Sequence, residues 1–189
     1  DWRVVVFTCR SETLDLIVSK LTQAGLRVGT ICGGGGVQNQ QAVEAYSCQP
    51  PRVNVLVSTD TGAEGVNLQA GNVMVNYDLP WNPMIVEQRI GRIQRLGSKF
   101  RNVVILNLAV ADSPEDRIVA RLLQKLIEIA ESIGDIESIL EAASESSGAK
   151  ISVEEQITEM VRKALQGQNV EKERALAEEN ILNAKRQLA

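Results

Sequence analysis

The sequence predicts an α/β protein in which a doubly wound parallel sheet, flanked by helices, is followed by an all-helical extension. Over residues 1–112, short apolar runs rich in Val and Ile alternate with segments of helical periodicity, which is typical of a parallel sheet covered on both faces. From residue 113 onward only helical patterns remain. We therefore expect a sheet domain over 1–112, a helical segment over 113–148 packed on it, and a more mobile helical tail over 149–189.

Five apolar runs are the predicted strands. They are Val4 to Phe7, Val53 to Val57, Val73 to Tyr77 and Val103 to Leu108, with a weaker run from Arg27 to Cys32. Their β-branched composition favours extended backbone, and the absence of polar alternation indicates burial on both faces. Ligands of such sheets bind at the carboxyl ends of the strands, so the turns that follow the strands are the candidate site.

Helical patterns fill the gaps between the runs. The first begins at Ser11, a candidate N-cap, and ends at Ala24-Gly25, the second covers Val37 to Tyr46, and the third covers Ile85 to Ile93. Asn82-Pro83 before the third helix supplies a cap and a first-turn proline.

Composition excludes several classes of chemistry. The 189 residues are 44% hydrophobic and 23% charged, which suits a globular core, and no apolar run approaches the roughly 20 residues of a membrane span. The absence of histidine removes His-based acid/base catalysis, and the three cysteines, without a CxxC, indicate neither a disulfide framework nor a metal site. We expect a protein of the cytoplasm.

Charge is distributed unevenly along the chain. Residues 1–110 carry 10 basic and 8 acidic side chains, whereas residues 111–189 carry 10 and 16. A basic cluster lies in the first part, where the only nearby acid is Glu87; its members are Arg89, Arg92, Arg95, Lys99 and Arg101. The cluster predicts an anionic partner.

Two segments carry phosphate-binding chemistry. The run Ser58-Thr59-Asp60-Thr61-Gly62-Ala63-Glu64-Gly65-Val66-Asn67-Leu68 ends a strand in hydroxyls and a Gly-rich turn, which offers donors to a phosphate. In the run QRIGRIQRLG, which starts at Gln88, Arg92 and Arg95 are three residues apart. On a helix both guanidinium groups would project from one face, where they could grip a triphosphate.

These two segments resemble motifs five and six of the superfamily 2 helicases, in the C-terminal of their two RecA-like, P-loop NTPase-type domains. The run Tyr77-Asp78-Leu79-Pro80-Trp81-Asn82-Pro83 is similar to Swi/Snf-type double-stranded DNA translocases, and the bacterial HepA-like branch looks closest. The resemblance covers roughly residues 4 to 140, with Val4 to Arg10 in the place of motif four.

The resemblance implies a role for each matching residue. Arg92 and Arg95 would act as arginine fingers on the γ-phosphate of ATP, while Gly65, Asn67 and Gln88 would lie near the nucleotide. The expected contacts to DNA are Thr8, Arg10, Thr59 and Trp81, although Trp81 is equally compatible with a core position.

The chain lacks the other half of an ATPase site. It has no GxxxxGK[ST] loop, since no lysine follows Gly33-Gly34-Gly35-Gly36, and no acidic box to hold Mg²⁺. ATP with Mg²⁺ would therefore be held mainly by an N-terminal RecA-like domain of the same protein, and this chain alone is expected to be inactive. Expected partners are that domain, double-stranded DNA and a larger protein complex, with no membrane.

Two alternatives stay open at this point. The chain could be a non-catalytic nucleotide- or nucleic-acid-binding adaptor that shares the fold. It could also be part of a DEAD-box-like RNA helicase, which Trp81-Asn82-Pro83 and Gln88 disfavour.

Overall fold

The structure is a computed structural model that describes residues 2–94, 100, 102–113, 115–122, 124, 139–143 and 152–188. The chain divides into two compact units. The first comprises residues 1–78 and 88–108, and the second comprises residues 79–87 and 109–189.

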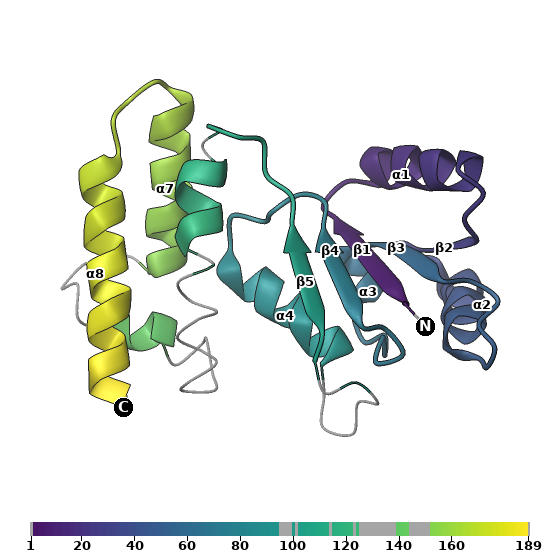
Figure 1. Ribbon diagram of the computed structural model, residues 1–189. Helices are drawn as coiled ribbons and strands as arrows, with labels where there is room; N and C mark the ends of the chain where they lie inside the picture. The colour runs from purple at the N-terminus through teal and green to yellow at the C-terminus, as the bar shows by residue number, and fades with distance from the viewer. Residues whose placement is uncertain are drawn as a thin grey trace. The chain divides into compact units, whose positions relative to one another are not determined.

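The first unit is built on a five-stranded parallel sheet (Figure 1). Its strands are β1 (Val4–Thr8), β2 (Val28–Ile31), β3 (Val55–Thr59), β4 (Val73–Asn76) and β5 (Val104–Asn107), in the spatial order β2-β3-β1-β4-β5. The predicted parallel sheet is confirmed, including its weakest strand. Strand order reverses at β1, which pairs with β3 on one side and with β4 on the other. This is the position at which doubly wound sheets form a crevice.

The register brings the strand ends to one edge of the sheet. Thr8 pairs with Thr59, Phe7 with Asn76, and Asn76 with Asn107. Polar residues that end four different segments of the sequence therefore lie at the same carboxyl edge.

The three predicted helices are confirmed as α1 (Ser11–Gln23), α2 (Gly36–Ser47) and α4 (Pro83–Ile93), and a short α3 (Asp60–Ala63) adds to them. Of α4, residues 88–93 belong to the first unit. The cap expected at Asn82 is present, since its Oδ1 accepts a hydrogen bond from Met84 N at 2.8 Å. The cap expected at Ser11 is wrong: Ser11 is already helical, and Arg10 holds the N-cap position without a side-chain bond.

Helices cover the two faces of the sheet. On one face α1 contributes Leu14 and Ile17 to a cluster with Val6, Val55 and Val57. On the other face, residues of α2, α3 and α4 pack with the alternate side chains of the same strands; this cluster includes Tyr46, Ala63, Ile93, Phe7, Leu56 and Met74. The α1 and α2 ribbons accordingly lie on opposite sides of the sheet in Figure 1. Burial of both faces is what the unbroken apolar runs predict.

The edge strand β5 departs from that prediction. Val104 and Leu106 are 44% and 49% exposed, so the expectation that this run is buried on both faces is wrong. The side chain of Ile105 packs on the α2 and α4 face, whereas the main contacts of α1 on the opposite face are to β1, β2 and β3. The reason is therefore the reach of α1, which a strand's own composition does not encode.

The secondary-structure elements described in the second unit are helices. A π-helical turn η1 (Glu115–Ala120) and the helix α8 (Glu171–Leu188) both contact α7 (Val153–Leu165). A reciprocal capping box starts α7: Ser152 Oγ accepts from Glu155 N at 3.2 Å, and Ser152 N donates to Glu155 Oε2 at 3.1 Å. The packing of 113–148 on the sheet and the mobility of the tail stay predictions. None of the described helices is long and apolar enough to span a membrane.

Candidate functional site

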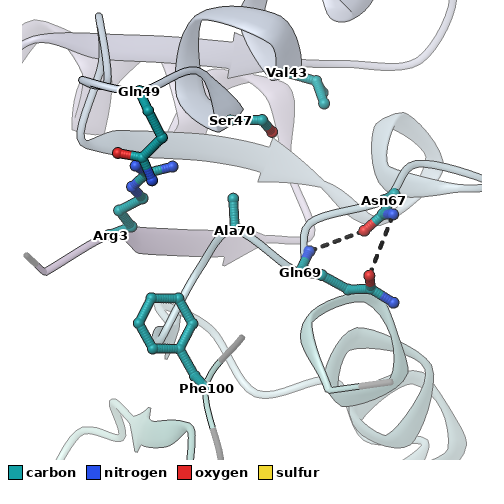
Figure 2. Close-up of a pocket in the computed structure, with 8 residues that line it drawn as sticks. All are labelled: Arg3, Val43, Ser47, Gln49, Asn67, Gln69, Ala70 and Phe100. Atoms are coloured by element: carbon teal, nitrogen blue, oxygen red, sulfur yellow. Dashed lines mark hydrogen bonds between the residues drawn. The ribbon is translucent and has the colours of Figure 1, made fainter. Parts of the chain in front are cut away.

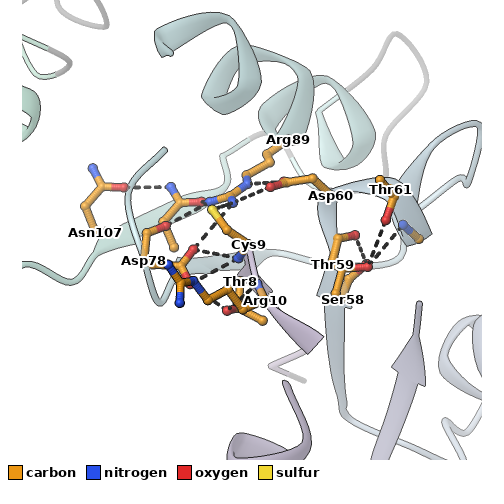
Figure 3. A network of polar contacts seen from close by, with 12 residues as sticks. Thr8, Cys9, Arg10, Ser58, Thr59, Asp60, Thr61, Asp78, Arg89 and Asn107 are labelled. Atoms are coloured by element: carbon orange, nitrogen blue, oxygen red, sulfur yellow. Dashed lines mark hydrogen bonds and ion pairs between the residues drawn. The ribbon is translucent and has the colours of Figure 1, made fainter. Parts of the chain in front are cut away.

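A buried arginine organises the carboxyl edge of the sheet (Figure 3). Arg89, on α4, has a side chain that is only 2% exposed. It forms a bidentate pair with Asp60, with Nε to Oδ1 at 2.6 Å and Nη2 to Oδ2 at 2.9 Å. Its Nη1 donates to Asn76 Oδ1 at 2.8 Å and to the carbonyl oxygen of Asp78 at 3.1 Å. Such a forked pair fixes orientation as well as charge.

Further contacts complete the surroundings of Arg89. Its Nη2 donates to Cys9 Sγ at 3.6 Å, and its guanidinium carbon lies 5.3 Å from the centre of the Phe7 ring. Asn76 in turn donates to Asn107 Oδ1 at 2.7 Å. One side chain thereby ties α4 to the ends of β1, β3 and β4.

This network corrects one expectation from the sequence. Arg89 belongs to the basic cluster expected to face an anionic partner, but its charge is buried and paired within the protein. The missed partner is Asp60, which lies 29 positions away in the sequence. The available signal was an acidic residue immediately after a strand, within the otherwise uncharged segment Val53–Gly62.

Asp78 connects this network to the end of β1. Its Oδ2 accepts from the Thr8 hydroxyl at 2.6 Å, and its Oδ1 accepts from Cys9 N at 2.8 Å. Burial, and then the hydrogen bond to Asp78, raise the pKa of the Cys9 thiol to about 12, so the thiol stays protonated at neutral pH. Thr8 is buried with its hydroxyl engaged, whereas Arg10 is exposed just beyond it.

Thr59 starts the short helix α3. Its Oγ1 accepts from Gly62 N at 3.2 Å and lies 3.4 Å from the hydroxyl of Thr61. Thr59 is buried, whereas Thr61 is exposed. A Cβ on Gly62 would lie 2.6 Å from the carbonyl oxygen of Ile31, so the turn after β3 needs glycine for its close approach to β2.

The turn after α3 lies against the end of α4. Leu68 N donates to the carbonyl oxygen of Arg92 at 3.0 Å, which places the predicted nucleotide residue Asn67 beside the predicted finger Arg92. Gly65 is exposed with a φ of 72°, a left-handed conformation that favours glycine. Arg92 is half-buried, and Asn67 and Gln88 are exposed.

Two predicted site residues fall outside this arrangement. Arg95 lies outside the described residues. Trp81 is half-buried and belongs to the second unit, so the structure does not bring it together with Thr8, Arg10 and Thr59, which share the carboxyl edge of the first.

The acidic side chains at this edge are engaged within the protein. Within the described ranges, no group of three or more His, Cys, Asp or Glu residues is arranged to hold a metal. The two carboxylates at this edge, Asp60 and Asp78, are both paired with Arg89. Arg92, on the same helix as Arg89, is half-buried, and its carbonyl oxygen accepts the bond from Leu68 N.

Comparison with known families assigns the chain. It belongs to the helicase conserved C-terminal domain family, which matches residues 1–97. The chain is 37% identical over 140 residues to the ATP-dependent helicase YqhH of Bacillus subtilis, an alignment that covers 74% of this chain and 25% of that protein. It is 30% identical over 128 residues to the ISWI chromatin-remodelling ATPase CHR11 of Arabidopsis thaliana, with 67% and 12% covered.

A solved structure supports the same fold. The C-terminal part of the Fun30 ATPase domain superposes with a TM-score of 0.55 at 23% identity, covering 61% of this chain and 38% of that one. The expected superfamily 2 helicase family with Swi/Snf-type relatives and the expected RecA-like fold are therefore confirmed. The chain spans only about a quarter of the length of YqhH, so the activity of the whole protein is a matter for proposal.

Proposed function

We propose that this chain is the C-terminal half of an ATP-dependent, Swi/Snf-like double-stranded DNA translocase that acts in the cytoplasm. In this proposal Arg92 and Arg95 serve as arginine fingers. They reach ATP and Mg²⁺ held mainly by an N-terminal RecA-like domain of the same protein. The similarity to YqhH, named as an ATP-dependent helicase, and to CHR11, named as a chromatin-remodelling ATPase, supports the ATP-driven class.

The observation that carries the proposal is how α4 is held. Arg89 is locked to the ends of three strands, and Arg92 follows it one helical turn later with a partly accessible side chain. The bond from Leu68 N to the Arg92 carbonyl holds the Gly-rich turn beside it. An arginine finger must be in position before negative charge develops on the γ-phosphate, since electrostatic stabilisation depends on preorganised groups.

ATP supplies the γ-phosphoryl group whose transfer to water builds up negative charge. Guanidinium groups that approach this charge in trans are worth about 10³–10⁵ in rate in well-studied NTPases. In this chain Arg92 would meet the phosphate, while the exposed Gly65 and Asn67 would line the nucleotide side and Gln88 would lie one turn before Arg92 on α4.

The proposed DNA contacts are Thr8, Arg10, Thr59 and Trp81. Arg10 is exposed and can pair directly with a backbone phosphate. Thr8 and Thr59 are buried with engaged hydroxyls, so they would support the DNA-facing edge by holding Asp78 and the start of α3.

The test uses a protein that carries this chain together with its N-terminal RecA-like domain. Arg92→Ala should lower kcat for ATP hydrolysis at saturating duplex DNA by at least ~10², equivalent to ~2.7 kcal/mol. Arg92→Lys should rescue poorly because it lacks the planar fork. Arg27→Ala is the matched control, since Arg27 is exposed and its side chain donates to Asn54 on the protein surface, and its kcat should be unchanged.

The other functional classes predict different results. If Arg92 only binds DNA phosphates, Arg92→Ala would weaken DNA affinity and its salt dependence while kcat stays unchanged. Stronger activation by duplex RNA than by duplex DNA would favour the DEAD-box-like alternative. An intact protein without nucleic-acid-stimulated turnover would favour the adaptor.

A further inference from the structure

A pocket lies at the amino edge of the sheet, where the strands begin and opposite the carboxyl edge that holds Arg89 (Figure 2). It has a volume of about 420 Å³, within the roughly 300–1,000 Å³ range of small-molecule sites. Its walls include Arg3, which precedes β1, Ala70, which precedes β4, and Phe100, which precedes β5. The residues that form the site around Arg89 follow the strands, so the two places are distinct.

The pocket contains a buried cation. Arg3 is only 3% exposed, and it donates from Nη1 to the Tyr46 carbonyl at 2.8 Å and from Nη2 to the Cys48 carbonyl at 3.3 Å. Both carbonyls lie at the C-terminal end of α2, where the helix dipole supplies only about half of a negative charge. In the part of the chain that the structure describes, no carboxylate lies within ion-pair distance of Arg3.

A buried charge without a full counter-charge is costly. An anion in the pocket would supply the missing part, and the guanidinium has N–H groups beyond the two that its carbonyl bonds use. The site therefore favours a phosphate or a similar oxyanion over a neutral ligand.

The rest of the wall combines carboxamides with apolar groups. Gln49, Asn67 and Gln69 line the pocket with carboxamides. Asn67 and Gln69 bond to each other, with Nδ2 of Asn67 donating to Gln69 Oε1 at 3.4 Å and Gln69 N donating to Asn67 Oδ1 at 3.0 Å, which leaves the Gln69 amide nitrogen and the Gln49 carboxamide for a ligand. Figure 2 shows the Ala70 methyl group between the Arg3 side chain and the Asn67–Gln69 turn, with the Phe100 ring on the other side of the Ala70 backbone. Mixed donors and acceptors suit the edge of a nucleobase, and flat or apolar surfaces suit its faces.

We propose that this pocket binds a mononucleotide-sized phosphate monoester. Its phosphate would pair with Arg3, and its base would lie over the Ala70 methyl group with its edge toward the carboxamides. This site is separate from the proposed ATP cleft, although Asn67 borders both.

The test titrates the 189-residue chain with AMP, adenosine and inorganic phosphate by calorimetry. AMP should bind more tightly than either of its halves, because the pocket contacts both. Arg3→Met removes the charge, and Ala70→Leu fills the cavity while leaving Arg3 and its helix-capping bonds in place. Each should weaken AMP binding at least ~10-fold. Thermal melting shows whether each variant is folded, and Ala70→Leu decides if Arg3→Met is not.

Two control variants separate this pocket from other surfaces. Arg27→Met removes an exposed arginine, and Arg92→Gln removes the cation of the proposed ATP cleft; AMP binding should be unchanged in both. The proposal is overturned if AMP does not bind at millimolar concentration, or if phosphate alone binds as well as AMP. It is also overturned if Ala70→Leu binds AMP normally or if Arg92→Gln abolishes binding. None of these AMP-binding outcomes tests the proposed role of Arg92 as an arginine finger. That role is tested by kcat for ATP hydrolysis.

Discussion

At the scale of single residues, the candidate site depends on Arg89, a buried cation that bonds to groups of the protein itself. Arg89 is buried, and its partners Asp60, Asn76 and Asp78 come from the ends of β3 and β4. Their hydrogen bonds compensate its desolvation, but removing it would leave Asp60 and Asn76 without their partner. The residue most important for the architecture of this edge is therefore one that the proposed chemistry does not use.

Replacing Arg89 should destabilise the fold. Arg89→Met is expected to lower the free energy of unfolding by roughly 3 kcal/mol, toward the low end for broken buried pairs because Asp60 keeps some access to water. Arg52→Met is the matched control: the pair between Arg52 and Glu44 is 64% and 75% exposed and should matter by less than about 1 kcal/mol. Urea unfolding of both variants measures the difference, and equal effects would contradict a structural role for Arg89.

Tyr46 and Gly71 make a second residue-level prediction. Tyr46 is fully buried, its hydroxyl finds no hydrogen-bond partner among the residues that the structure describes, and burial raises the pKa of its phenol. A Cβ on Gly71 would lie 2.5 Å from that hydroxyl oxygen. Gly71→Ala should therefore cost about 1–3 kcal/mol.

The second-site change Tyr46→Phe should remove most of this cost, because it deletes the clashing atom. Alone it should be close to neutral, since the hydroxyl is unsatisfied. Thermal denaturation of the two single variants and the double variant tests the coupling. Additive effects in the double variant would show that the hydroxyl is not the obstacle.

At the scale of elements, the site depends on how the helices α3 and α4 are held against each other and against the sheet. The helix α3 carries Asp60 toward Arg89 and presses its backbone against the end of β2 at Gly62. The helix α4 carries Arg89 inward, and near its end the carbonyl oxygen of Arg92 accepts from Leu68 N. Packing of these elements, more than helix propensity, sets where the proposed finger lies.

Two glycines in these helices should respond in opposite ways to the same substitution. In Gly62→Ala the new Cβ would meet backbone atoms of Ile31 and Cys32 at 2.6–2.7 Å, so we expect a loss of at least about 2 kcal/mol. In Gly91→Ala no atom of the described residues lies within 4 Å of the new Cβ, and alanine should stabilise α4 by about 0.5–1 kcal/mol. Chemical denaturation measures the change in the free energy of unfolding of both variants. If both changes had the same sign, the packing argument would be wrong.

At the scale of the whole molecule, the chain carries one side of the proposed ATPase site. It offers Arg92 and a Gly-rich turn, but it has no phosphate-binding loop with lysine and no acidic box. Because phosphoryl transfer needs the metal and the positioned water as well as the finger, the proposed activity would require the assembly of two RecA-like domains.

The isolated 189-residue chain should therefore show no DNA-stimulated ATP hydrolysis. Adding the N-terminal RecA-like domain, in the same polypeptide or as a separate chain, should create activity that depends on Arg92. Steady-state phosphate release with and without duplex DNA measures this. The expectation that ATP hydrolysis requires both domains would be overturned if the chain alone hydrolysed ATP. That turnover would have to persist through repeated purification and disappear in Arg92→Ala.

The sequence by itself determined the strands, the main helices and the family. Apolar runs and helical periodicity are local patterns, so all five strands and the cap at Asn82 were predictable, as was the motif that contains Arg92. Local sequence also explains the helix α7, which begins at the capping box of Ser152 and Glu155.

Only the tertiary structure decided which of these residues meet. Asp60 and Arg89 lie on different elements, and only the order of the strands brings them within 2.6 Å. The exposure of Val104 and Leu106 follows from how far α1 reaches across the sheet, and the burial of Arg3 follows from the position of the end of α2. Pairing and burial depend on contacts between distant segments, and a pattern of neighbouring residues carries no information about those contacts.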